Sequence, residues 1–228
     1  MRVLDLGCGS GVLTAEMHRE LAAATTLGLD NSAEMLANSD DHKTAGVSFE
    51  CRDLTRLSGV HADLVFSNAA LHWLTDHNAV FDRVASMVTA GGQLAVQVPA
   101  NHDETAHLLA DEIAQEAPFA TKLGGFVRGN SVEHPRWYDH KLRSLGFTER
   151  RVEVRIYPCE LESADGVIQW LRGSLLTAYQ TRMSAADFES FVGRFRERLF
   201  EALGQRVDER PFYYPYARIL MWARRSAT

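Results

Sequence analysis

The chain has 228 residues and a formal net charge of −6, with 46% hydrophobic and 24% charged residues. This composition is typical of one globular domain, alone or with an insertion, and it argues against a general surface for nucleic acid or a membrane. Three widely spaced cysteines, Cys8, Cys51 and Cys159, favour a reduced cytoplasmic setting over a disulfide framework or a zinc cluster, so no metal is expected.

Short apolar runs alternate with helix-like stretches over the first hundred residues. The runs predict strands over 2–6, 25–30, 47–53, 62–68 and 92–98. Several are apolar almost throughout, as expected for parallel strands whose two faces are covered by helices. Helices are predicted near 11–22, 32–41 and 76–89, with an N-cap at Asn31-Ser32 and an end at Gly91-Gly92. Repeated β-α units of this kind predict a doubly wound α/β domain.

The pattern changes after residue 103. Further elements are predicted as helices near 103–117 and 134–145, a strand from 147 to 160, two amphipathic helices within 163–206, and a closing strand at 217–225. Ser184 and Asp187 form a capping-box-like start, and phenylalanines at helical spacing follow, which predicts a buried stripe. We therefore expect a core of residues 1–162 and 207–228, with 163–206 inserted as a helical lid.

A glycine loop follows the first strand directly, in the sequence "DLGCGSGVLT". Loops at the carboxyl ends of strands bind ligands in open α/β sheets. Gly7, Gly9 and Gly11 give the spacing G-x-G-x-G, which differs from the G-x-G-x-x-G of dinucleotide-binding loops, and no Lys-Ser or Lys-Thr pair forms a P-loop. The loop therefore predicts a ligand without a diphosphate.

Three acids stand at the ends of three successive strands. Asp5 lies inside the end of the first strand, Asp30 ends the second, and Asp53 ends the third. Asp30 is placed to accept hydrogen bonds from both ribose hydroxyls, and Asp53 to accept one from an exocyclic amine such as that of adenine. Each acid alone could instead brace a loop, cap a helix or form a turn. Together they favour an adenosine with a cationic tail, which is the character of S-adenosylmethionine (SAM).

Five segments together resemble the class I SAM-dependent methyltransferases: "VLDLGCGSG", "LGLDNSAEML", "ECRDL", "ADLVFSNAALHWL" and "GGQLAVQVP". More narrowly, "SNAALHWLTDH", "LAVQVPAN" and "YPYARILMWARR" are similar to the trans-aconitate 2-methyltransferase family. The resemblance implies a seven-stranded, mostly parallel Rossmann-like sheet whose last strand is antiparallel. It also implies a cytoplasmic methyltransferase that turns SAM into S-adenosylhomocysteine.

The resemblance also assigns cofactor-binding positions. Asp5, Gly7, Cys8, Gly9 and Gly11 would line the methionine end of SAM. Asp30 and Asn31 would hold the ribose, Asp53 and Leu54 would contact adenine, and Asn68 would lie near the methionine amine and the methyl group.

The acceptor implied by the resemblance is a carboxylate of a small polycarboxylic acid. Such an acceptor is already ionised at neutral pH and needs donors to hold it rather than a base. The candidates are His72, Trp73 and Arg218, with Arg128, Tyr179 and Arg182 in or near the lid as weaker ones. Each of the first three has an ordinary structural alternative as a satisfied histidine, a packed tryptophan or a solvated arginine.

Family members usually carry a helical segment before the first strand that helps to cover SAM, whereas this strand begins at residue 2. If nothing replaces that segment, SAM should bind more weakly and the substrate site should be less enclosed. Alternatives remain open: methylation of a hydroxyl, phenol or carrier-protein-bound acyl group, or a SAM-binding protein without catalysis. A dehydrogenase is disfavoured by the glycine spacing. We expect a monomer or weak homodimer that binds neither nucleic acid nor membrane.

Overall fold

The structure, a computed structural model, describes residues 1–227 and divides into two compact units. The α/β unit comprises Met1–Pro99, Ser131–Arg155 and the residues from Arg218 onward. The helical unit comprises Ala100–Asn130 and Ile156–Ala217. The chain therefore passes from one unit to the other four times.

A seven-stranded sheet in the order β3-β2-β1-β4-β5-β9-β6 forms the centre of the α/β unit. Its strands are β1 (Arg2–Leu6), β2 (Thr25–Asp30), β3 (Val47–Cys51), β4 (Ala62–Asn68), β5 (Val88–Pro99), β6 (Phe147–Tyr157) and β9 (Tyr216–Arg225). The first five strands pair in parallel, and β9 is antiparallel to β5. The predicted fold class is confirmed.

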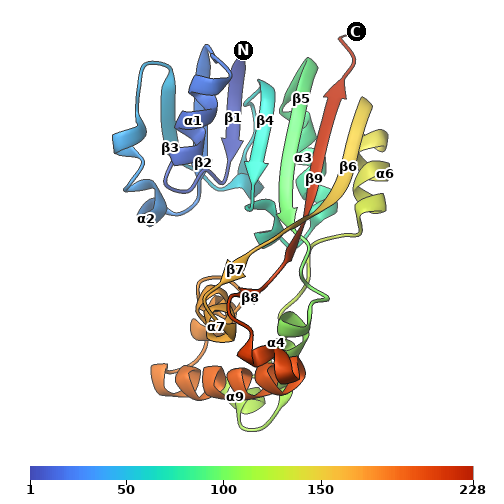
Figure 1. Cartoon of the computed structure of the whole chain (residues 1–228). Coiled ribbons are helices and arrows are strands. Elements are labelled where there is room, and N and C mark those ends of the chain that lie inside the picture. Colours follow the sequence, from blue (N-terminus) through green and yellow to red (C-terminus); the bar gives the residue numbers. More distant parts are fainter. Residues whose placement is uncertain (228) are drawn as a thin grey trace. The chain divides into compact units, whose positions relative to one another are not determined.

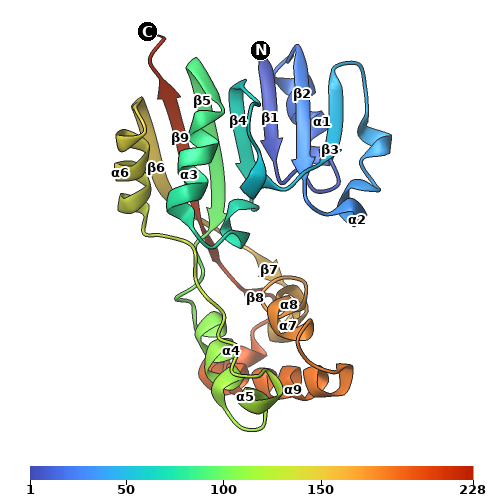
Figure 2. The ribbon, with the colours of Figure 1, turned by 180° about the vertical axis from the view of Figure 1, so that it is seen from behind.

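Helices lie on both faces of this sheet. They are α1 (Val12–Glu20), α2 (Ala33–Leu36), α3 (His77–Ser86) and α6 (Pro135–Ser144). Figures 1 and 2 show α1 on one face beside β1 to β3, and α3 and α6 on the opposite face beside β4, β5, β9 and β6. The strand interiors are buried, with Leu4, Leu29, Val65 and Leu94 at most 1% exposed, because helices and neighbouring strands cover them.

The helical unit has an apolar core of its own. Its elements are α4 (Thr105–Gln115), α5 (Phe119–Lys122), α7 (Ala164–Arg172), α8 (Thr177–Gln180), α9 (Ala185–Leu203) and the two-stranded sheet of β7 (Glu160–Leu161) and β8 (Phe212–Tyr213). Ser184 caps α9 by accepting a hydrogen bond from the Asp187 amide, and the phenylalanine stripe Phe188, Phe191 and Phe195 is buried as predicted.

Three expectations were wrong in their bounds. The helical unit is larger than 163–206, because α4 and α5 bury their apolar side chains in the same core as α9 rather than against the sheet. The helix predicted over 32–41 is one turn of α helix followed by a 3-10 turn, Asp40–His42. Gly91-Gly92 lies within β5, where the register with β4 shifts, so these glycines accommodate a bulge rather than end a helix.

Within residues 1–227, no helix has the length and apolar character that crossing a membrane requires.

Candidate functional site

The glycine loop, residues 7–11, is shaped by its backbone. Gly7, Gly9 and Gly11 have φ values of 77°, 57° and 82°, in the left-handed region that favours glycine. The amides of Gly7 and Cys8 both donate to the carbonyl of Leu29, at 2.7 and 3.0 Å. A Cβ atom at Gly7 would lie 2.1 Å from the Cβ of Ala70, so this glycine also permits close packing against the loop after β4.

The ring of Phe49 of β3 packs against the backbone of the glycine loop. A Cβ atom at either Gly11 or Gly28 would lie 2.6 Å from the Phe49 ring. The bare backbone at these two positions therefore makes room for an aromatic ring. Sequence reasoning did not include Phe49 in the site, although the glycine inside the apolar run "TTLGLD" indicates a close approach at that point.

Asp5 is 1% exposed at the end of β1. Its Oδ2 accepts a hydrogen bond of 2.6 Å from the hydroxyl of Thr14, a residue that sequence reasoning missed. Burial, together with the negative charge of Asp30, raises the pKa of Asp5 to about 6. Its Oδ1 is buried and has no hydrogen-bond partner among the described residues. A ligand with a positive charge or a hydrogen-bond donor would therefore satisfy a costly buried acceptor.

Asp30 joins the glycine loop to the start of α2. Its Oδ2 accepts from the Gly9 amide at 2.9 Å, and its Oδ1 accepts from the Ser32 amide at 2.9 Å. Ser32, rather than Asp30, is the N-cap of α2. Each carboxylate oxygen can accept a further bond, so the side chain can brace the loop and still accept from a ligand.

Asp53 and Leu54 follow β3. The Asp53 Oδ1 accepts from both the amide and the hydroxyl of Thr55, at 2.8 and 2.7 Å, which forms a short turn and lowers the pKa of Asp53. Leu54 lines a cavity of about 320 Å³ together with Trp73 and residues of α3. Asp53 therefore forms a turn, as one of its structural alternatives predicted, and its contact with adenine stays a prediction.

Cys8 lies within the glycine loop and is not positioned as a nucleophile. Burial and the nearby carboxylates of Asp5 and Asp30 raise the pKa of its thiol to about 12. Because the thiolate is the reactive form, Cys8 is unreactive at neutral pH. Its small side chain suits a tightly packed loop.

The loop of residues 69–74 follows Asn68, the last residue of β4, and contains the 3-10 turn η3 (Leu71–Trp73). Burial, with further contributions from His77 and Arg218, lowers the pKa of His72 to about 4. The His72 Nδ1 is buried and has no partner among the described residues. Trp73, whose ring lies 4.8 Å from that of His72, is 63% exposed and so is not packed beneath the site.

Arg218 reaches this region from β9. Its Nη1 donates to Gln97 Oε1 of β5 at 2.7 Å, and its charge contributes to the low pKa of His72. Gln97 is 6% exposed, and its Nε2 has no hydrogen-bond partner in the described part of the chain. The structure thus brings His72 and Arg218 together with Gln97. Sequence reasoning missed Gln97, although a glutamine within the apolar run "LAVQVP" is a signal.

The three weaker candidates belong to the helical unit. Arg128 binds Asp111 through Nε and Nη2, at 3.1 and 3.0 Å, and the Tyr179 hydroxyl donates to the same carboxylate. The Arg182 guanidinium lies 3.9 Å from the centre of the Phe126 ring. These contacts stabilise the helical unit internally, and a role in substrate binding stays a prediction.

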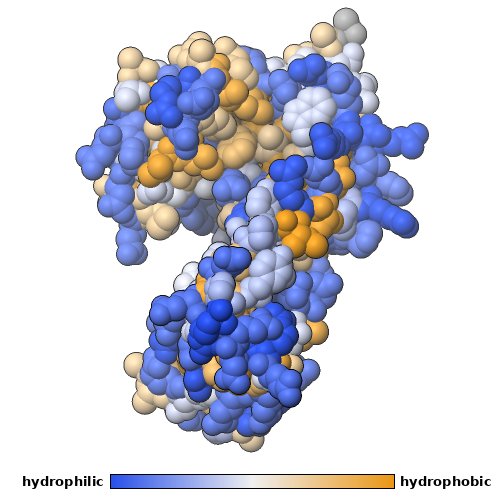
Figure 3. Space-filling model, viewed as in Figure 1, coloured by the Kyte–Doolittle hydropathy of each residue, from blue (hydrophilic) through white to orange (hydrophobic). Residues whose placement is uncertain are grey.

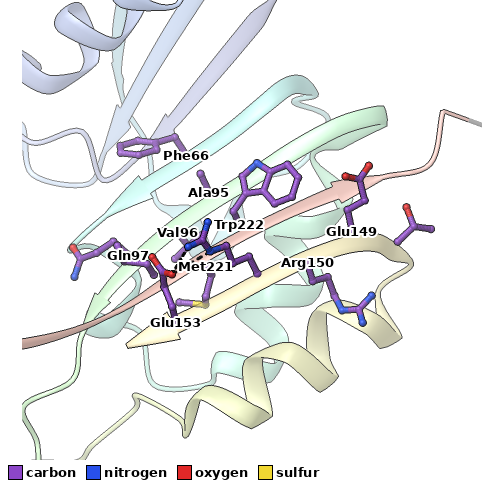
Figure 4. A pocket seen from close by; sticks show the side chains of 12 residues that line it. Phe66, Ala95, Val96, Gln97, Glu149, Arg150, Glu153, Met221 and Trp222 are labelled. Carbon is purple, nitrogen blue, oxygen red and sulfur yellow. Dashed lines mark hydrogen bonds and ion pairs between the residues drawn. The ribbon is translucent and has the colours of Figure 1, made fainter. Parts of the chain in front are cut away.

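A cavity of about 850 Å³ lies on the sheet face opposite α3 and α6 (Figure 4). Phe66, Ala95 and Trp222 are register neighbours on β4, β5 and β9 and project from this face. Arg151 and Glu153 of β6, which also line the cavity, form an ion pair of 2.9 Å. Figure 3 shows apolar surface on this side of the α/β unit next to α1. No residue of the glycine loop lines the cavity, whereas Gln97, the hydrogen-bond partner of Arg218, does.

The family profile described as "Methyltransferase domain" matches residues 1–145. A trans-aconitate 2-methyltransferase of Deinococcus radiodurans is 40% identical over 98% of this chain and 86% of its own length. The trans-aconitate 2-methyltransferase of Methylobacterium nodulans is 34% identical over 99% and 87%. The chain belongs to this methyltransferase family.

Solved structures show the same fold for the methyltransferase. The YcgJ protein of Bacillus subtilis matches with a TM-score of 0.60 and 16% identity, over 99% of this chain and 92% of that protein. Phosphoethanolamine N-methyltransferase 2 of Haemonchus contortus, solved with SAM, matches with a TM-score of 0.56 and 16% identity, over 99% and 49%. The protein is a SAM-dependent methyltransferase, and its cofactor is SAM.

Two features of this chain fit that cofactor. The glycine loop has three residues without a side chain in the left-handed region, Gly7, Gly9 and Gly11, so a ligand can approach its main chain. The buried Asp5 Oδ1 offers an acceptor to a cationic group. The side chains beside the glycine loop are acidic, which suits a ligand that carries ammonium and sulfonium charges.

Proposed function

We propose that this methyltransferase esterifies a carboxylate of a small polycarboxylic acid, of the kind named in its trans-aconitate 2-methyltransferase relatives. The observation that carries the proposal is the state of His72. With a pKa of about 4, this side chain is neutral at pH 7 and a weak base. A base for a hydroxyl or phenol acceptor works best with a pKa near the operating pH. A carboxylate acceptor needs no base, because it is already ionised.

SAM supplies a methyl group on a sulfonium, which an ionised carboxylate oxygen can take by direct displacement without transfer of a proton. The task of the protein is to align the acceptor and to exclude water. In the proposed arrangement, the donor side is formed by Asp5, Gly7, Cys8, Gly9, Gly11, Asp30, Asn31, Asp53, Leu54 and Asn68.

Arg218 and His72 form the proposed acceptor side. A guanidinium has five N–H donors in a planar fork that matches a carboxylate, and it keeps its charge at any working pH. Gln97 orients this fork through its Oε1. The Nε2 of neutral His72 can donate a hydrogen bond without adding a competing proton transfer. Trp73, with its large exposed ring, gives the acceptor an apolar wall.

The test combines calorimetry with a substrate panel. We expect S-adenosylhomocysteine to bind and radiolabelled methyl groups to pass from SAM to tricarboxylates, with base-labile esters as products. Dicarboxylates, phenols, sugars and acylated carrier protein serve as the comparison acceptors. Turnover only on phenols, with a basic limb in the pH profile, would overturn the carboxylate proposal. Binding of S-adenosylhomocysteine without turnover on any acceptor would instead indicate a SAM-binding protein.

A further inference from the structure

His77, the first residue of α3, is buried at 2% exposed although it takes no part in the proposed chemistry. Both of its ring nitrogens have partners. Nδ1 lies 2.7 Å from the hydroxyl oxygen of Tyr138 on α6, and Nε2 lies 3.1 Å from the carbonyl oxygen of Leu71. Figure 2 shows that α3 and α6 lie side by side on this face of the sheet.

The direction of these hydrogen bonds follows from the two groups on either side of the His77 ring. The Leu71 carbonyl can only accept, so His77 Nε2 carries the hydrogen and Nδ1 accepts. Tyr138 must then donate its hydroxyl hydrogen to Nδ1. Its oxygen in turn accepts from the Glu133 amide at 3.0 Å. Burial lowers the pKa of His77, which agrees with a neutral ring.

A second contact holds the next carbonyl of the same loop. The Ser131 hydroxyl donates to the carbonyl oxygen of His72 at 2.6 Å. Successive carbonyls, of Leu71 and His72, are therefore both held by side chains, and both bonds depend on the segment 131–138. Ser131 is also the first residue of the α/β unit after the chain leaves the helical unit at Asn130.

We propose that Ser131, Tyr138 and His77 are positioning residues that fix the loop 69–74, and with it His72 and Trp73, for the methyl acceptor. The part of this inference that concerns turnover rests on the proposed function. The part that concerns the conformation of the loop 69–74 does not depend on which acceptor is methylated. Because hydrogen bonds in a buried chain polarise one another, loss of one member weakens the whole connection to Leu71.

Packing alone offers a different explanation, since Tyr138 also touches the rings of Phe81 and Trp137. Tyr138→Phe separates the two explanations, because it keeps the ring and removes only the hydroxyl. Ser131→Ala removes the second contact without touching the aromatic cluster. Ser144→Ala is its matched control, because the Ser144 hydroxyl also donates to a backbone carbonyl, that of Lys141 on α6.

The first readout is kinetic. For Tyr138→Phe and Ser131→Ala, we expect KM for the accepted polycarboxylate to rise by up to about fivefold with kcat nearly unchanged, since the displaced His72 loses a binding contact of about 1 kcal/mol. The Kd of S-adenosylhomocysteine should stay within about twofold, because the hydrogen bonds of Ser131 and Tyr138 go to His72, His77 and Glu133, which lie outside residues 5–11. Ser144→Ala should leave both values unchanged.

The second readout is the titration of His72 by NMR, which needs no substrate. In a loosened loop His72 becomes hydrated, so its pKa should rise from about 4 towards its ordinary value of 6.5 in the two variants and not in Ser144→Ala. An unchanged His72 titration together with an unchanged KM for the polycarboxylate would overturn the inference. If Tyr138→Phe does not fold, Ser131→Ala alone decides. If the wild type turns over no polycarboxylate, the proposed function fails, while the titration still decides the positioning role.

Discussion

The glycine loop and the loop 69–74 lie in contact, yet they are held in opposite ways. Residues 7–11 take their shape from glycine backbone in the left-handed region and from amides that bind the carbonyl of Leu29. The loop 69–74 contains no glycine and is held by two side chains. The Ser131 hydroxyl, 59 residues further along the sequence, binds the His72 carbonyl, and His77, itself bound by Tyr138, binds the Leu71 carbonyl. The glycines that shape the first loop are visible in the sequence, whereas the side-chain contacts that hold the second loop appear only in the assembled fold.

The largest expected effect is that of Gly7→Ala, which tests whether the two loops depend on each other. The new Cβ would lie 2.1 Å from the Cβ of Ala70, and φ is 77°. Overpacking and a strained φ together cost about 4 kcal/mol, so S-adenosylhomocysteine should bind roughly a thousandfold more weakly by calorimetry. Gly59→Ala is the control, since φ is 73° there with open space around it. Gly59→Ala should leave the Kd unchanged, and an unchanged Kd for Gly7→Ala would show that the cofactor site does not depend on the contact between the loops.

Asp5→Asn tests how much the buried carboxylate beside the first loop destabilises the folded state at neutral pH. The pKa of Asp5 is raised from 3.8 to about 6, so the native state binds this proton more tightly than the unfolded state. Stability from this group therefore falls as pH rises from about 4 to about 6, by up to about 3 kcal/mol. We expect Asp5→Asn to be more stable than the wild type at pH 7.5, and the difference to shrink as pH falls through 6. Chemical denaturation at several pH values measures it; a difference that is constant with pH would contradict the prediction.

Asp30→Ala removes both the hydrogen bond that braces the first loop and the proposed contact with the ligand. The variant loses the bond to the Gly9 amide and the proposed bidentate acceptor for ribose, so SAM affinity should fall at least tenfold, or about 1.4 kcal/mol. Asp41→Ala, at an exposed position beyond α2, should leave the Kd unchanged. An unchanged Kd for Asp30→Ala would show that the side chain does not contribute to the cofactor site.

His72→Ala gives the smallest effect and sharpens the account of the second loop. A neutral donor contributes about 1 kcal/mol, so KM for the polycarboxylate should rise roughly fivefold with kcat nearly unchanged. The exposed His61 serves as the matched histidine control. A collapse of kcat with loss of a basic limb would identify His72 as a general base instead.

The local features were accessible from the sequence. Strands β1, β2 and β4 begin and end at the predicted residues, since short apolar runs bounded by glycine or acid define them. The glycine spacing and the acids of successive strands also pointed to the cofactor that the family uses. Ser184 and the phenylalanine stripe specified α9 and its buried face.

The tertiary features were not accessible. Phe49 and Thr14 look like ordinary strand and helix residues until the fold places them against Gly11 and Asp5. Nothing near Ser131 or Tyr138 in the sequence indicates a partner about sixty residues earlier. The bounds of the helical unit were wrong for the same reason, because only packing shows that α4 shares a core with α9.

The position of β9 has a consequence for synthesis of the chain. This strand comes last in chain order, yet it lies between β5 and β6 in the sheet. Strands β1 to β5 can therefore assemble while the rest of the chain is still being made, at about 5–20 residues per second. Strand β6 has no sheet neighbour until β9 emerges. The glycine loop thus forms early, and the proposed acceptor side with Arg218 is completed only after β9 has been made.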